Sequence, residues 1–274
     1  MSALAQAGGI ITDKIILSRR RVELHIFIPI LFLFLFITTV ILCPFFSNVS
    51  PEFFSVKYIS IFIGMILAAV IWNVFYYRGV QAEKVHDFEL IMMSQPLFTI
   101  LLASMFLKNE QNWHLLLAAV VASFALILAN IKKEHFVFST ATIGLVLAVI
   151  LMSVELILID LLLNVLSPVI LYAMRTGLIS IFFLLYYRPH LKLVSRENLW
   201  WIFLTAALGT FQMIAKFYGF AEFGVIYTSL ILILAPTLTY IISTLFLHEK
   251  LKIQQVAYGL VIVGCIVYAT FLGR

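Results

Sequence analysis

The sequence has few charged residues and almost no cysteine. Charged side chains make up 11% of its 274 residues, whereas soluble domains carry about 25%. Hydrophobic residues make up 64%, and the mean hydropathy is +1.11. This composition excludes a soluble globular protein and predicts a chain that crosses a membrane many times.

Motifs of common enzyme chemistry are also missing. The six histidines show no metal-ligand spacing, and no phosphate-binding glycine loop occurs. Cys43 and Cys265 lie in or beside apolar runs, where cysteine acts as a small hydrophobic residue. We therefore expect no enzyme activity, no cofactor and no metal. The formal charge of +5 fits loop lysines and arginines at a lipid surface and predicts no nucleic-acid binding.

Long apolar runs dominate what is present. A helix of about 20 apolar residues spans a hydrocarbon core of roughly 30 Å, and continuous runs disagree with the alternation of barrel strands. We predict nine membrane-spanning helices separated by short loops: 26–46, 58–77, 86–107, 113–131, 136–160, 168–187, 199–218, 225–247 and 253–272.

The amino-terminal residues 3–17 are apolar but too short to cross a bilayer. Aligning Asp13 with Asp160 places this segment over the second part of the span at 136–160. We interpret it as the tail of a first helix whose beginning is missing. The intact protein would then have ten spans.

The sequence repeats itself at an offset of 140 residues. Each copy has a proline inside a charge-free apolar run that ends in Phe-Leu and a glutamate, Glu110 or Glu249. This duplication predicts two repeats of five helices each, residues 1–133 and 134–274. Because five is odd, the second repeat would enter the membrane from the opposite side, giving an inverted repeat. The aligned pairs include Gly79 with Gly219, Pro96 with Pro236, Thr99 with Thr239, and Phe106 with Phe246.

The paired proline runs and their endings resemble the EamA-like family of the drug/metabolite transporter superfamily. The run "YGLVIVGCIVYA", with Gly259 and Gly264, is similar to the glycine-bearing last helix of that family's repeat. The resemblance implies a ten-helix bundle that moves small metabolites. It also implies that both termini are cytoplasmic, whereas lysine and arginine in alternate connections place the carboxy terminus outside.

Ionisable residues inside apolar runs are functional candidates, because burying a charge in lipid costs a few kcal/mol. Glu155, Asp160 and Arg175 qualify, and so does Lys216 near the end of its run. One interpretation makes Glu155 a substrate or proton site. The other pairs its carboxylate with Arg175 or Lys216 and joins two helices.

Two polar faces align at the same offset. Trp72 and Tyr76 share one helix face with neighbouring Asn73, and Gln212 and Lys216 share the other. Such faces could line a central substrate cavity. The alternative is a belt at the membrane interface, which fits Tyr76 and Lys216 better than the deeper residues.

The prolines suggest kinks, because each removes a helical hydrogen bond. Pro96 and Pro236 could bend as a gate moves, or could mark static kinks; Gln95 and Tyr227 lie on the same helices. Glu110 and Glu249 are predicted to cap the amino end of the next helix, where negative charge is favoured.

These features favour a secondary transporter for a small polar or amphipathic metabolite, such as an amino acid. A non-transporting membrane scaffold on the same helical bundle is the alternative. As partners we expect the lipid bilayer, the substrate, and a coupling proton or exchanged solute. We further expect a monomer in the plasma (inner) membrane.

Overall fold

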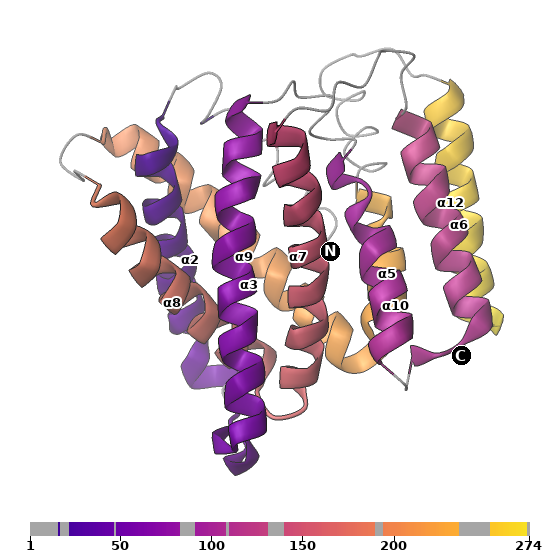
Figure 1. Ribbon diagram of the computed structural model, residues 1–274, viewed down its shortest axis with the longest axis horizontal. Helices are drawn as coiled ribbons and strands as arrows, with labels where there is room; N and C mark the ends of the chain where they lie inside the picture. Colours follow the sequence, from indigo (N-terminus) through magenta and orange to yellow (C-terminus); the bar gives the residue numbers. More distant parts are fainter. Residues whose placement is uncertain are drawn as a thin grey trace. The chain divides into compact units, whose positions relative to one another are not determined.

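The computed structural model describes residues 16, 22–46, 48–82, 91–107, 110–130, 140–189, 194–235 and 253–272. This part of the chain is helical, apart from an isolated bridge between Val49 and Leu166. Its elements are α2 (Leu24–Phe46), the 3-10 helix η2 (Pro51–Phe54), α3 (Val56–Ala82), α5 (Gln95–Phe106), α6 (Trp113–Asn130), α7 (Thr140–Leu163), α8 (Pro168–Tyr187), α9 (Arg196–Phe223), α10 (Val225–Leu232) and α12 (Ile253–Leu272) (Figure 1).

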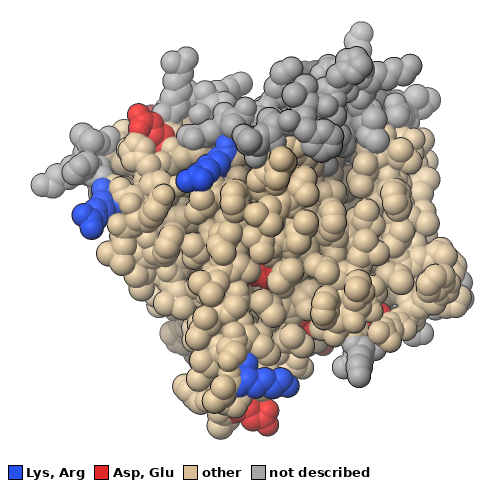
Figure 2. Space-filling model, viewed as in Figure 1, with Lys and Arg blue, Asp and Glu red and all other residues tan. Residues whose placement is uncertain are grey.

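The apolar runs form helices close to where the sequence predicts them. Helices α8 and α12 have the predicted bounds, and α6 ends one residue earlier than predicted. Non-charged side chains cover most of the face drawn in Figure 2. Within the described residues, five helices are long and apolar enough to cross a membrane, namely α2, α8, α9 and most of α3 and α7. The protein is therefore a multi-pass integral membrane protein, and its described part is built from helices.

Helices α3 and α9 are longer than predicted. They contain 27 and 28 residues and extend past the expected ends at 77 and 218. Tyr76 and Lys216 are followed by six and seven further helical residues. The cavity and interface-belt interpretations of both residues stay predictions.

The two proline-containing runs are broken helices, which corrects the continuous spans predicted at 86–107 and 225–247. In the first run, Met93 and Ser94 form a turn and α5 begins at Gln95. In the second run, α10 ends at Leu232 and Ile233 forms a turn. Met93 and Ile233 are 140 residues apart, so both repeats break at the same place.

Pro96 is the second residue of α5 rather than a residue in a helix interior. The first N–H groups of a helix have no intrahelical partner, so a proline there sacrifices no hydrogen bond. The expected loss of a helical bond at Pro96 is therefore wrong. Pro236, Glu249 and Asp13 lie outside the described residues, as does the predicted first-helix tail apart from Ile16.

The chain forms two compact units. Unit 1 comprises Met1–Ile66 and Leu161–Ala221, and unit 2 comprises Leu67–Asp160 and Glu222–Arg274. Each unit takes residues from both halves of the chain. The compact units thus do not follow the two sequence repeats.

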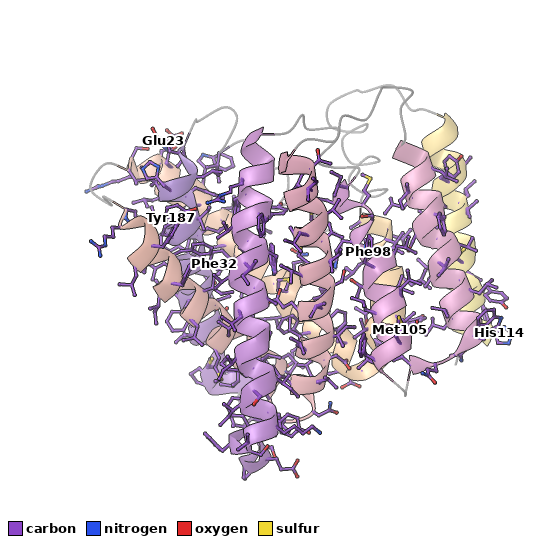
Figure 3. The ribbon with its side chains drawn as sticks, in the orientation of Figure 1. Glu23, Phe32, Phe98, Met105, His114 and Tyr187 are labelled. Atoms are coloured by element: carbon purple, nitrogen blue, oxygen red, sulfur yellow. The ribbon has the colours of Figure 1, made fainter. Side chains whose placement is uncertain are left out.

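In unit 1, α2 and α8 pack along each other in opposite directions. The rings of Phe32 and Phe183 lie 5.5 Å apart, and Phe32 lies midway along the α2 ribbon in Figure 3. Towards the other end, the Ser167 N–H donates to the Asn48 carbonyl over 2.9 Å. Between these points a Cβ at Gly177 would come within 2.8 Å of the Phe36 ring, so glycine permits the close approach.

Helix α9, as far as Ala221, also belongs to unit 1. The hydroxyls of Thr38 in α2 and Thr210 in α9 share a hydrogen bond of 2.7 Å. The Tyr172 ring of α8 meets the Phe217 ring of α9 edge-on at 5.7 Å. Hydroxyl bonds and ring contacts of this kind hold membrane helices together where the hydrophobic effect does not.

In unit 2, α6 and α12 also pack in opposite directions. His114, at the start of α6, shares a hydrogen bond of 2.8 Å with the Tyr268 hydroxyl near the end of α12; Figure 3 places His114 at that end of α6. The short helices α5 and α10 pack on each other and on α6. Trp113 and Ile253, where α6 and α12 begin, are 140 residues apart, so the packed helices occupy equivalent repeat positions.

Candidate functional site

A buried carboxylate and an indole form a polar contact between two helices of unit 2. The Trp72 Nε1–H of α3 donates to the Glu155 carboxylate of α7 over 2.6 Å, and Glu155 is 2% exposed. At 2.6 Å this is a short hydrogen bond between two helices. It fixes the indole orientation beside the carboxylate.

Aromatic rings extend this contact along α3. The Tyr76 ring stands edge-on to that of Trp72 at 5.9 Å, as expected for residues one helical turn apart. Tyr77 continues the series at 5.0 Å from Tyr76. The shared face of Trp72 and Tyr76 is therefore confirmed, and it lies next to a carboxylate from α7.

A hydroxyl network ties the start of α5 to α7. Thr99 donates to the Ser153 hydroxyl over 3.1 Å, and the Gln95 side-chain amide donates to Thr99 over 3.0 Å. Ser153 also lies 3.3 Å from the Gln95 carbonyl. Gln95 therefore lies in a polar cluster directly after the helix break, in the same unit as Glu155.

The break itself is packed on α7. Ile91 forms a buried cluster with Leu145 and Val149, and Met92 and Phe98 pack against that cluster from the two sides of the turn. Figure 3 shows Phe98 in the upper part of α5. Side chains on both sides of the helix break therefore pack against α7 within unit 2.

Two other candidates have partners close by. The buried Asn73 amide donates to the Ala69 carbonyl of its own helix over 2.7 Å. The Tyr227 hydroxyl shares a hydrogen bond of 2.8 Å with Thr270 of α12. A role in substrate binding stays a prediction for both residues.

Unit 1 holds the cationic candidates. Arg175 of α8 is 5% exposed, and half-buried Lys216 of α9 lies with its ammonium 5.5 Å from the centre of the Phe220 ring. Gln212 lies one turn before Lys216 on the same helix. The predicted pairing of Glu155 with Arg175 or Lys216 stays a prediction.

Glu110, between α5 and α6, caps a helix amino terminus as predicted, but a different helix from the one expected. Its carboxylate accepts the N–H groups of Val225 and Ile226, at 2.5 and 2.6 Å, and so caps α10. Asn112 caps α6 instead, by accepting from His114 over 3.0 Å. Burial raises the pKa of Glu110, and the two N–H donors lower it by a smaller amount.

Sequence reasoning missed Ser153 and Gly224. Ser153 is a single hydroxyl residue in an apolar run, and its partners Gln95 and Thr99 lie more than 50 residues away. One indication of this hydroxyl network was present in the sequence, because Thr99 aligns with Thr239 in the repeat.

Among the described residues, no three His, Cys, Asp or Glu side chains gather closely enough to hold a metal ion.

Comparison with protein families gives the decisive observation. Residues 139–271 match the model of the EamA-like transporter family, a family of the drug/metabolite transporter superfamily. Residues 139–271 are thus similar to EamA-like transporters. The resemblance inferred from the proline runs is thereby confirmed, and the family that the match names is one of membrane transporters.

The EamA-like match begins next to α7 and ends within α12. It therefore contains Glu155 and the cationic candidates of unit 1, whereas Trp72 lies before it.

A crystal structure with 13% sequence identity superimposes with a TM-score of 0.74, over 100% of this chain and 95% of the other. That likeness shows the fold alone. No curated protein matches the sequence.

Proposed function

We propose that this protein is a secondary transporter that moves a small polar or amphipathic metabolite, such as an amino acid, by alternating access. A solute gradient or exchange would drive it, since the sequence has no nucleotide-binding motif. The protein would act as a monomer in the plasma membrane.

The observation that carries this proposal is the antiparallel packing of equivalent helices. Helices α2 and α8 pack in opposite directions in unit 1, and α6 and α12 do so in unit 2. An inverted repeat requires this arrangement, since its two copies cross the membrane in opposite senses. We infer a ten-helix inverted repeat, which supplies two conformations of similar energy, each open to one side.

The paired breaks at Met93–Ser94 and Ile233 support the same proposal. Transporters of inverted-repeat architecture bind substrates at discontinuous helices, where unwound backbone can face a polar solute. In unit 2 the break adjoins the cluster of Gln95, Thr99 and Ser153. We infer that the substrate binds among this cluster, Trp72 and Glu155.

Glu155 is the inferred proton carrier. Its burial at 2% exposure makes an ionised carboxylate costly, and the Trp72 indole supplies one of the hydrogen bonds that offset this cost. A group of this kind can exchange its proton as its surroundings change during transport.

One observation favours the scaffold alternative. Asn73 is 1% exposed, and its amide is satisfied by its own helix. If Trp72 and Gln212 were packed in the same way, no polar chamber would be left for a solute.

Counterflow in proteoliposomes tests the proposal. Vesicles loaded with each amino acid in turn would be diluted into the labelled form, with protein-free vesicles as the reference. We expect at least one amino acid to accumulate, and we expect Glu155→Gln to abolish or flatten the dependence of uptake on pH. The exposed Glu52→Gln variant, which also removes one carboxylate, should behave as wild type.

Two results would count against these assignments. Absence of counterflow for the whole panel would favour the scaffold. Normal pH dependence in Glu155→Gln would remove the proton role from Glu155 and leave transport itself standing.

A further inference from the structure

The contact between Glu110 and α10 joins segments 115 residues apart. Both carboxylate oxygens are used, one on the Val225 N–H and one on the Ile226 N–H. Charge-assisted bonds of this kind are about twice as strong as neutral ones. Glu110 belongs to the first half of the chain and α10 to the second, so the contact bridges the two halves.

The backbone conformation of Gly224 and its lack of a side chain permit this contact. Its φ of +82° lies in the region that favours glycine, and a Cβ there would come within 2.9 Å of a Glu110 oxygen. Any other side chain at this position would push the carboxylate away from the N–H groups. Glycine in the turn before α10 therefore leaves room for the Glu110 carboxylate.

Both partners adjoin a broken helix. Glu110 follows α5, which has 12 residues and starts directly after the break at Met93–Ser94. Helix α10 has 8 residues and ends at the break at Ile233. Short segments that pack on each other and are hinged at one end can separate by a small rotation, and the Glu110 contact lies at the end away from each break.

We propose that Glu110 is a latch that holds α10 against the end of α5 and closes one gate of the transporter. The gate role rests on the proposed transport function; the latch contact does not. Opening this side requires the Glu110 carboxylate to leave the N–H groups of Val225 and Ile226, after which α10 can move away from α5.

Two measurements that need no substrate test the latch. The first is amide hydrogen exchange of residues 224–232 in lipid nanodiscs. The second is labelling of a Thr228→Cys variant, with Cys43 and Cys265 replaced by alanine, by a water-soluble maleimide in membranes. Thr228 is buried on α10 and its hydroxyl has no hydrogen-bond partner within the described residues, so cysteine should be tolerated and protected while the gate is closed.

Glu110→Gln removes the charge and turns one acceptor into a donor facing another N–H. We expect exchange at Val225 and Ile226, and labelling at residue 228, to rise about tenfold. Gly224→Ala should give the same result, because its Cβ would displace the Glu110 carboxylate from the N–H groups. Asn112→Ala is the matched control, because it removes a helix cap two residues away but should affect only the start of α6.

The outcomes separate the latch from the transport proposal. Unchanged labelling and exchange in both Glu110→Gln and Gly224→Ala would overturn the latch, whatever the uptake result. An equal rise in Asn112→Ala would also overturn it, since general loosening would then explain the effect. A selective rise without any uptake by wild type would keep the latch and refute transport.

Discussion

The Trp72–Glu155 hydrogen bond can be measured by a double-mutant cycle. Trp72→Phe removes the indole N–H and keeps an aromatic ring, and Glu155→Gln removes the charge and keeps the shape. The bond is 2.6 Å long and its acceptor is 2% exposed. Hydrogen bonds to charged groups contribute about 1.5–3 kcal/mol, whereas bonds between membrane helices average about 0.6 kcal/mol and reach about 1.7. We expect a coupling free energy of about 1–2 kcal/mol.

The assay is reversible unfolding of the four proteins by sodium dodecyl sulfate in mixed micelles, followed by circular dichroism. Each single variant should lower the free energy of unfolding, and the double variant should lose less than the sum of both. A coupling free energy indistinguishable from zero would refute the reasoning, since it would mean that the indole does not stabilise the buried carboxylate.

Three further predictions use the same unfolding assay. Gly79→Ala should cost about 1–3 kcal/mol, because a Cβ there would overlap the Leu145 side chain, whereas Gly264→Ala should change little, since nothing lies within 4 Å; equal effects would refute this. Because burial raises the pKa of Glu110 in the folded protein, the free energy of unfolding should fall as pH rises past the ordinary glutamate pKa and through the raised one; a Glu110→Gln variant with an unchanged pH profile would contradict this. Ser153→Ala should cost about 1 kcal/mol by removing the hydroxyl bridge between α5 and α7, and wild-type stability would show the bridge to be dispensable.

Hydropathy and the 140-residue offset predicted most of the fold. The bounds of α8 and α12 follow from apolar length alone, because the bilayer core fixes how many residues a helix needs. The shared face of Trp72 and Tyr76 follows from helical periodicity in the same way. These features are local, so a sequence reports them directly.

The breaks and the long-range contacts could not be predicted in this way. Hydropathy stays high through Met93 and Ile233, so an apolar run alone does not show where a helix is interrupted. The sequence predicted that Glu110 caps a helix, since negative charge is favoured at a helix amino terminus. The choice of α10 rather than α6 depends on packing between segments 115 residues apart, which local patterns do not encode.

The packing of α2 on α8 affects how the protein is made. Helix α2 ends at Phe46 and α8 begins at Pro168, so at about 5–20 residues per second the ribosome needs roughly 6–24 seconds to supply the partner. Helix α2 must wait in the lipid during that time with its packing face uncovered. Neither half of the chain can complete a compact unit alone, because each unit takes residues from both halves.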